Sequence, residues 1–203
     1  MNKSSQHIIG LTGGIATGKT TVSNYLANTY NIPIFDADIY AREAVEPGSP
    51  ILDKIVERYG KNILISDGKL DRKQLGNIIF NQPNERHWLE QQIHPYVRDR
   101  FQKAINELPL NATAVLAIPL LFEAKITCLV TEIWVVFAEK QQQLDRLINR
   151  DGLTLEQAEA RINSQMSLEE KCQMADVVLD NSSTLENLLK QVDNIMYAGK
   201  HSL

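Results

Sequence analysis

Residues 7–21 constrain the fold of this chain more than any other stretch. Residues 8–11, Ile-Ile-Gly-Leu, form a short apolar run that predicts a buried strand. A loop with the pattern G-x-x-x-x-G-K-[ST] follows from Gly13 to Thr20, and a helical pattern of apolar residues comes after it. A strand, a glycine-rich loop and a helix in this order are the context that a phosphate-binding loop requires. The chain is therefore expected to bind a nucleoside triphosphate.

Each residue type in this loop has a chemical task. Glycines let the backbone turn tightly, so that successive N–H groups point inward and form a concave anion site. A helix that starts near Gly18 adds the positive end of its dipole. Lys19 can reach the β- and γ-phosphates, and the Thr20 hydroxyl can ligate the Mg²⁺ that accompanies ATP. The residues expected to bind the nucleotide here are Gly13, Gly14, Ile15, Ala16, Thr17, Gly18, Lys19, Thr20 and Thr21.

Two other readings of the loop are disfavoured. The first is a chance match within an ordinary strand–turn–helix, which the flanking apolar patterns disfavour. The second is a dinucleotide-binding turn, which requires G-x-G-x-x-G. The glycines stand at positions 10, 13, 14 and 18, which is the wrong spacing, and that turn has no need of a lysine.

Length and composition limit the remaining classes. A chain of 203 residues predicts one domain, or one core with an inserted lobe. The net charge of −4 gives no global field for nucleic acid or an anionic membrane, so neither is expected as a partner. No stretch approaches the roughly 18 apolar residues that span a bilayer, and residues 1–6 lack the apolar core of a signal sequence. Cys128 and Cys172 have no metal-ligand spacing and fit a reducing compartment, so a cytoplasmic location is expected.

Two carboxylates follow the second predicted strand. Residues 32–35 read as a buried strand that leads directly into Asp36 and Asp38. Ligands of α/β sheets bind at the carboxyl ends of strands, so both aspartates are candidates for a substrate or metal site. They could instead cap the short helix that begins here. Both roles are compatible with each other.

Residues 49–111 contain no convincing strand and predict an all-helical lobe that could hold the second substrate. Ser49 and Asp71 are expected to cap two helices. A longer helical stretch from Pro83 is expected to be interrupted at His94-Pro95, because proline lacks the N–H of a helix interior. His94 could contact a ligand or form a structural hydrogen bond, and the sequence leaves both open.

Three further strands complete the pattern. They are expected at residues 113–118, 132–137 and 176–179. The first ends in Pro119-Leu120-Leu121-Phe122-Glu123, an apolar turn followed by one carboxylate. Capping boxes that start at Thr154, Ser167 and Ser183 predict two short helices and a last longer one.

A helix after the fourth strand places Arg146 and Arg150 on one face, because they lie four residues apart. These arginines could pair with nearby acids on a solvated face. They could also belong to a mobile lid that brings guanidinium groups onto the transferring phosphoryl group. The charged helical pair between the fourth and fifth strands favours the lid.

Sequence motifs that the chain lacks help to separate the classes of phosphate-loop protein. The chain has no Asn-Lys-x-Asp, which disfavours a GTP switch, and the third strand ends in Pro119 where motor ATPases have an aspartate. A small-molecule kinase remains the leading reading. The alternatives are a nucleoside or nucleotide kinase with the same phosphate loop, or an ATP-sensing module that binds ATP without transferring its phosphate.

The chain resembles the dephospho-coenzyme A kinase family. The resemblance rests on residues 11–15 leading into the lysine, on Asp36-Ala37-Asp38, and on further matches in the same order along the chain. These are Val45-Glu46-Pro47-Gly48, Ile93-His94-Pro95, Pro119-Leu120-Leu121-Phe122-Glu123, and Asp176 with Asp180-Asn181. Ala16-Thr17 departs from the family, which more often has Gly-Ser there.

The resemblance implies phosphorylation of the ribose 3′-hydroxyl of dephospho-coenzyme A by ATP with Mg²⁺, giving coenzyme A and ADP. Asp38 matches the family's candidate base, and Asp36 would position substrate or metal. Lys19, Arg146 and Arg150 would act on the phosphates, and Asn181 would lie at the adenine. The residues expected to contact the acceptor are Asp36, Asp38, His94, Leu121 and Glu123.

The fold expected from these patterns is a three-layer α/β phosphate-loop kinase fold with a five-stranded parallel sheet. Its core would comprise residues 1–48, 112–138 and 175–203. Residues 49–111 would form the helical coenzyme-A-substrate lobe, and residues 139–174 the lid. The sequence leaves the oligomeric state open between a monomer and a weak homo-oligomer.

Overall fold

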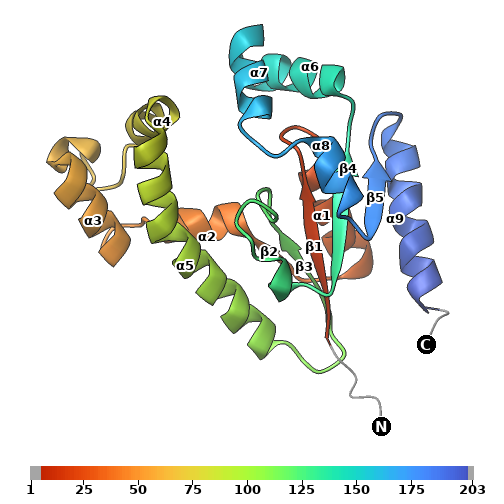
Figure 1. Ribbon diagram of the computed structural model, residues 1–203. Coiled ribbons are helices and arrows are strands. Elements are labelled where there is room, and N and C mark those ends of the chain that lie inside the picture. The colour runs from red at the N-terminus through yellow and green to blue at the C-terminus, as the bar shows by residue number, and fades with distance from the viewer. Residues whose placement is uncertain (1–5, 201–203) are drawn as a thin grey trace. The chain divides into compact units, whose positions relative to one another are not determined.

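The computed structural model describes residues 6–200 and contains a five-stranded sheet in the order β2-β3-β1-β4-β5 (Figure 1). The strands are β1 (His7–Gly13), β2 (Ile34–Asp36), β3 (Thr113–Ala117), β4 (Glu132–Phe137) and β5 (Val177–Asp180). β1 pairs in parallel with β3 and β4, and β4 pairs in parallel with β5. Every residue of β1 after its first is buried, as expected for the central strand of a sheet covered on both faces. This architecture confirms the predicted α/β fold.

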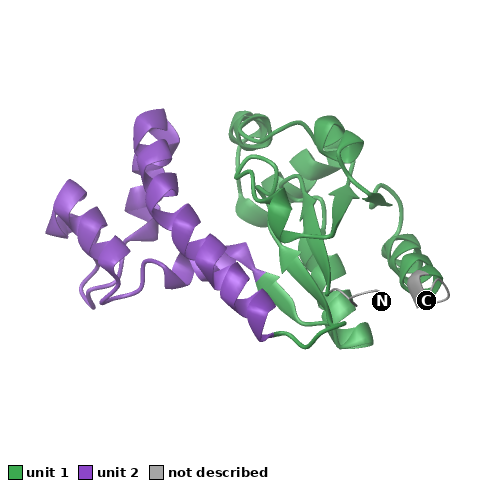
Figure 2. Cartoon of the chain, turned by 60° about the horizontal axis from the view of Figure 1, so that its bottom comes forward, with its two compact units in different colours: residues 1–35, 108–203 green, residues 36–107 purple. Residues whose placement is uncertain are grey.

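The chain divides into two compact units, residues 1–35 with 108–203 and residues 36–107 (Figure 2). The first unit contains the sheet and the helices α1 (Lys19–Tyr30), α6 (Lys140–Asp151), α7 (Leu155–Asn163), α8 (Leu168–Gln173) and α9 (Leu185–Lys200), with the short helix η2 (Thr127–Leu129). Its main core forms where α1 and α9 pack against the sheet. The buried members of that core are Ile9, Leu11, Val22, Leu26, Ile32, Val115, Trp134, Val136, Leu179, Leu188 and Val192.

The second unit is helical apart from one isolated antiparallel bridge between Leu64 and Leu70, and the sequence predicts helices for this part of the chain. It comprises α2 (Ala37–Glu43), α3 (Pro50–Tyr59), η1 (Lys61–Ile63), α4 (Arg72–Asn81) and α5 (Pro83–Glu107). The predicted caps are present, because Ser49 accepts from the Leu52 N–H at 3.0 Å and Asp71 accepts from the Gln74 N–H at 2.9 Å. The assignment of this unit to the acceptor, and of residues 139–174 to a lid, stays a prediction.

The predicted break at His94-Pro95 is wrong. α5 runs without interruption from Pro83 to Glu107, with Pro95 in its interior. A proline there removes one backbone hydrogen bond and costs about 3 kcal/mol in an isolated helix. Leu89 before it and Val97 after it are both buried, and burial of one large apolar side chain contributes about 1.5–3 kcal/mol. Packing on both sides of the proline therefore offsets its cost.

Other element boundaries also differ from the prediction by one or two residues. β3 ends at Ala117 and not at residue 118, and β5 spans Val177–Asp180 and not residues 176–179. The last helix is capped one residue later than expected, because the Asn187 N–H donates to the hydroxyl of Thr184 at 3.2 Å. Ser183 instead accepts a hydrogen bond from the Asn187 side chain. β2 spans Ile34–Asp36 and not residues 32–35. The capping boxes at Thr154 and Ser167 form as predicted.

Candidate functional site

The phosphate loop joins β1 to α1, and side chains bind several of its carbonyl groups. The Thr17 hydroxyl donates to the Gly14 carbonyl at 2.9 Å. Arg146 donates through Nη1 to the Ala16 carbonyl at 3.1 Å, and Asn181 donates through Nδ2 to the Thr17 carbonyl at 2.8 Å. The Ile15 and Thr17 N–H groups are also bound within the protein, to Gln165 and to the Gly14 carbonyl, so the available polar groups of the loop are its remaining N–H groups. A run of such N–H groups is what a concave anion site is made of.

The start of α1 adds further donors to this loop. Gly18 is the N-cap residue of the helix and has no side chain with which to cap it. The first N–H groups of a helix therefore remain available to an anion, and the helix dipole favours negative charge there. Lys19 is the first helical residue, and Thr20 beside it is exposed. The geometry suits phosphate groups at this end of α1.

Gly18→Ala is expected to weaken ATP binding by at least roughly tenfold. Gly18 has a φ of 104°, which an L side chain adopts at a cost of about 1–2 kcal/mol, and 1.4 kcal/mol corresponds to tenfold. A Cβ atom at this position would also clash with Nδ2 of Asn181, which holds the loop. Titration calorimetry with ATP measures the effect.

Gly152→Ala is the matched control for this substitution. Gly152 also has a positive φ, of 65°, but nothing lies within 4 Å of the position of its Cβ. It is expected to lower the free energy of unfolding while leaving the Kd for ATP unchanged. Equal ATP affinities in wild type and Gly18→Ala would contradict the assigned role of Gly18.

Ala16 adopts a φ of 60°, in the left-handed region that favours glycine. This is the position where the chain departs from the glycine that is more usual in the family it resembles. The alanine therefore costs conformational free energy that a glycine would not, and the sequence pattern alone does not reveal this. Ala16 packs at the edge of a small apolar cluster of α6 and α7, together with Ile15.

The two arginines of α6 have different surroundings. Arg146 lies against the loop, and its Nη2 also donates to the Asn181 carbonyl at 3.3 Å. Arg150 instead forms a bidentate pair with Asp151, with distances of 2.7 and 3.0 Å, and this pair lowers the pKa of the Asp151 carboxyl. The structure thus brings Arg146 to the loop but not Arg150. That either one contacts a phosphate stays a prediction.

The aspartates after β2 have distinct local roles. Asp36 caps α2, since its Oδ1 accepts from the Asp38 N–H at 2.7 Å. Asp38 lies in the first turn of α2 and is exposed. Among residues 6–200, no donor to the Asp38 carboxylate is found. The capping role of Asp36 does not exclude a role for Asp38 in catalysis.

The other predicted acceptor residues come from both units of the chain. His94 is exposed on α5 in the second unit. In the first unit, Leu121 is fully buried and packs near Gly10. Glu123 accepts hydrogen bonds from the backbone of Met166 and from Lys171. Contact of these three predicted residues with a substrate stays a prediction.

Two residues that contact the loop were not predicted from the sequence. Gln165 accepts from the Ile15 N–H at 3.0 Å, and the buried Lys171 reaches the Gly13 carbonyl at 3.5 Å. The partners are separated by 150 and 158 residues, and no local pattern connects positions so far apart. The only sequence signal nearby was the capping box at Ser167, which located the helix but not its contacts.

Among the described residues, no group of three or more His, Cys, Asp or Glu side chains is arranged to hold a metal ion. No helix in residues 6–200 has the length and apolar character needed to cross a bilayer. Cys128 and Cys172 are both free thiols.

A parallel sheet with a phosphate loop after its central strand is the fold of phosphate-loop nucleotide-binding proteins, which include small-molecule kinases. The solved shikimate kinase of Aquifex aeolicus has the same fold, with a TM-score of 0.53 at 16% identity over 95% of this chain and 98% of that one. A sequence model described as dephospho-CoA kinase matches residues 7–187. The chain therefore belongs to the dephospho-CoA kinase family.

Relatives and solved structures agree with this assignment. A dephospho-CoA kinase of Trichormus variabilis is 68% identical over 93% of this chain and 96% of its own length, and one of Synechocystis is 57% identical over 92% and 93%. The solved dephospho-CoA kinase of Campylobacter jejuni is 31% identical with a TM-score of 0.71, covering 98% of this chain and all of that one.

Proposed function

We propose that this protein transfers the γ-phosphoryl group of ATP to the ribose 3′-hydroxyl of dephospho-coenzyme A, giving coenzyme A and ADP. Membership of the dephospho-CoA kinase family along residues 7–187 carries this proposal. The phosphate loop at the carboxyl end of the central strand supports it, because a kinase must bind the donor there.

In the proposed reaction the 3′-oxygen attacks the γ-phosphorus, and the bond from that phosphorus to the bridging oxygen of ADP breaks. Lys19 and the loop N–H groups stabilise the charge that develops on the phosphoryl oxygens. Asp38 orients the hydroxyl and accepts its proton as the new bond forms. Its exposure and lack of a donor partner in the described part of the chain are compatible with this role.

The remaining assignments of the site belong to the same proposal. Asn181 lies against the loop and would contact the adenine of ATP. Arg146, which also lies against the loop, and Arg150 would act on the phosphates from the lid. Asp36 and His94, with Leu121 and Glu123, would position the acceptor. ATP is the phosphoryl donor and binds as a substrate, and Thr20 would hold the Mg²⁺ that accompanies it. That ion supplies charge neutralisation at the β- and γ-phosphates when bound.

The free cysteines support a cytoplasmic location. We further propose a monomer or weak homo-oligomer.

A comparison of acceptors tests the proposal. ADP release, measured in a coupled assay, is expected to depend on dephospho-coenzyme A and to stay near background with nucleosides or nucleoside monophosphates. Mass spectrometry of the product should locate the phosphate at the ribose 3′-position. Turnover with a nucleoside monophosphate alone would show another nucleotide kinase. ATP binding without acceptor-dependent ADP release would indicate a sensing module.

A further inference from the structure

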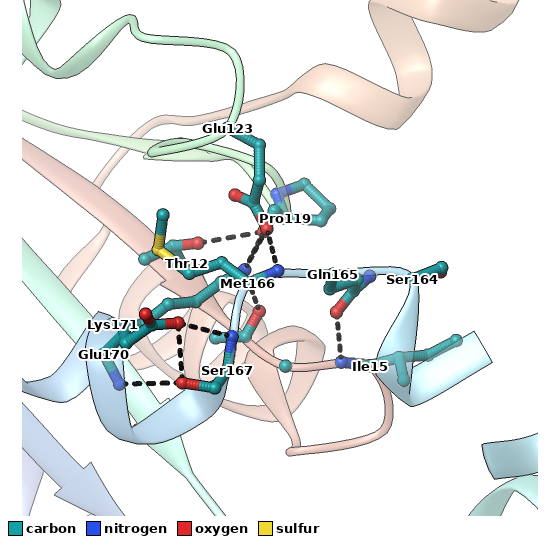
Figure 3. Close-up of polar contacts among 12 residues, drawn as sticks. Thr12, Ile15, Pro119, Glu123, Ser164, Gln165, Met166, Ser167, Glu170 and Lys171 are labelled. Carbon is teal, nitrogen blue, oxygen red and sulfur yellow. Dashed lines mark hydrogen bonds and ion pairs between the residues drawn. The ribbon is translucent and has the colours of Figure 1, made fainter. Parts of the chain in front are cut away.

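Lys171 is a fully buried lysine close to the phosphate loop (Figure 3). Its Nζ lies 2.9 Å from Oε1 of Glu123, 3.1 Å from the Pro119 carbonyl and 3.5 Å from the Gly13 carbonyl. An ammonium group has three N–H donors, and these three oxygens accept one each. A buried charge persists only when it is paired and hydrogen-bonded in this way. Lys171 therefore connects the first residue of the loop motif to the segment after β3.

Glu123 connects the same lysine to the chain that enters α8. Its Oε1 accepts from Lys171 and also from the Met166 N–H at 3.0 Å (Figure 3). Within the described residues, its buried Oε2 has no hydrogen-bond partner. A carboxylate with one oxygen in two charge-assisted bonds is strongly held. Glu123 thus fixes both Lys171 and the segment that precedes α8.

Gln165 lies one residue before Met166 and binds the loop directly. Its Oε1 accepts from the Ile15 N–H at 3.0 Å, so this N–H points at the protein (Figure 3). The Ile15 side chain packs against the apolar cluster of α6 and α7, whose buried members are Leu144, Leu147 and Ala158. The middle of the loop is therefore held by its backbone and by its side chain. Ile15 was expected to bind the nucleotide, but its N–H is already occupied.

We propose that Gln165 and Lys171 are positioning residues that hold the phosphate loop in its anion-binding shape. Gln165 binds the Ile15 N–H in the middle of the loop, and Lys171 binds the carbonyl at the loop's start. With these two points fixed, the other N–H groups are already oriented when ATP arrives. Preorganisation of this kind raises affinity because less ordering is required on binding. The proposal rests on the ATP site of the proposed function.

The variant Gln165→Met tests the proposal, because it keeps the side-chain length and removes the acceptor. We expect the Kd for ATP and for ADP, measured by calorimetry without acceptor, to rise roughly 3- to 10-fold, as loss of one hydrogen bond implies. KM for ATP should rise with it, KM for dephospho-coenzyme A should stay constant, and Tm should stay within about 2 °C. The control is Gln173→Met, an exposed residue at the end of α8, which should change none of these.

Lys171→Met combined with Glu123→Gln is the second variant, since it leaves no buried charge unpaired. Its Kd for ATP is expected to rise as well, whereas Lys190→Met, which breaks only an exposed pair with Glu186, should leave Kd unchanged. An unchanged Kd in Gln165→Met, or a lower Tm without a change in Kd, would overturn the proposal whether or not the Lys171 variant folds. Nucleotide binding needs no acceptor. A wild type that binds ATP but does not phosphorylate dephospho-coenzyme A would therefore refute the proposed function and leave this comparison decisive.

Discussion

The variant Lys19→Ala is expected to lose phosphoryl transfer, with kcat lowered by at least roughly 10²- to 10³-fold. Lys19 is the first residue of α1 and directly follows the last glycine of the loop. Its ammonium group is the one side-chain cation of the motif that can reach both the β- and γ-phosphates. Negative charge moves onto the bridging oxygen as the γ-phosphoryl group leaves. Removal of the Lys19 ammonium group therefore raises the energy of the transition state more than that of the bound substrate.

Single-turnover kinetics with saturating ATP measure this loss. The control is Lys140→Ala, because Lys140 is also the first residue of a helix and is exposed. It removes the same charge at the equivalent place in α6 and should leave kcat unchanged. Thermal unfolding of Lys19→Ala should match wild type, since Lys19 is only partly buried and no ion pair of its side chain is found in the described residues. Wild-type turnover in Lys19→Ala would refute the loop as the donor site.

Local sequence patterns predict much of this fold. β4 spans the predicted residues 132–137, because its nearly continuous apolar run has no other stable place than a covered strand. Ser49, Asp71, Thr154 and Ser167 cap helices where predicted. In each of these cases the cause lies within four residues of the effect. That range is what a pattern in a single sequence records.

The errors arise where distant contacts outweigh a local preference. Pro95 predicts a break, yet the burial of Val97 and Phe101 beyond it keeps α5 continuous. Ser183 and Thr184 both have a hydroxyl group that could cap α9. Only the hydrogen bond from the Asn187 backbone N–H to the Thr184 hydroxyl identifies Thr184 as the cap. In both cases the sequence shows the competing groups but not the energy that decides between them.

The candidate site shows the same limit. The loop is recognisable because its residues are contiguous, whereas its supports come from α6, the segment before α8, α8 itself and the turn after β5. Arg146 was predicted to act on the phosphates, and it reaches the loop 130 residues earlier in the chain. Gln165 and Lys171 were not predicted at all. Their contacts depend on how α7 and α8 return to the loop, which is a tertiary property.

The variant Asp38→Asn is expected to lower kcat by roughly 10²- to 10⁴-fold, the usual contribution of a general base, with the Kd for ATP nearly unchanged. Asparagine keeps the size and the polarity of the side chain but cannot accept the proton of the ribose hydroxyl. The Asp36 cap on the Asp38 N–H involves the backbone of residue 38, so the substitution preserves it. The expected loss therefore reports on the carboxylate alone. Steady-state rates with dephospho-coenzyme A and calorimetry with ATP measure the two quantities.

Asp53→Asn provides the matched control, because Asp53 also lies in the first turn of a helix of the same unit. Each substitution removes one negative charge from a helix N-terminus, which costs typically 0.3–1 kcal/mol of stability at an exposed site. A loss of activity that came only from a weakened helix would thus appear in both variants. If Asp38 is the base, only Asp38→Asn slows turnover, and the loss persists at saturating dephospho-coenzyme A. Turnover near the wild-type rate in Asp38→Asn would remove Asp38 from the mechanism and leave the base to be sought elsewhere.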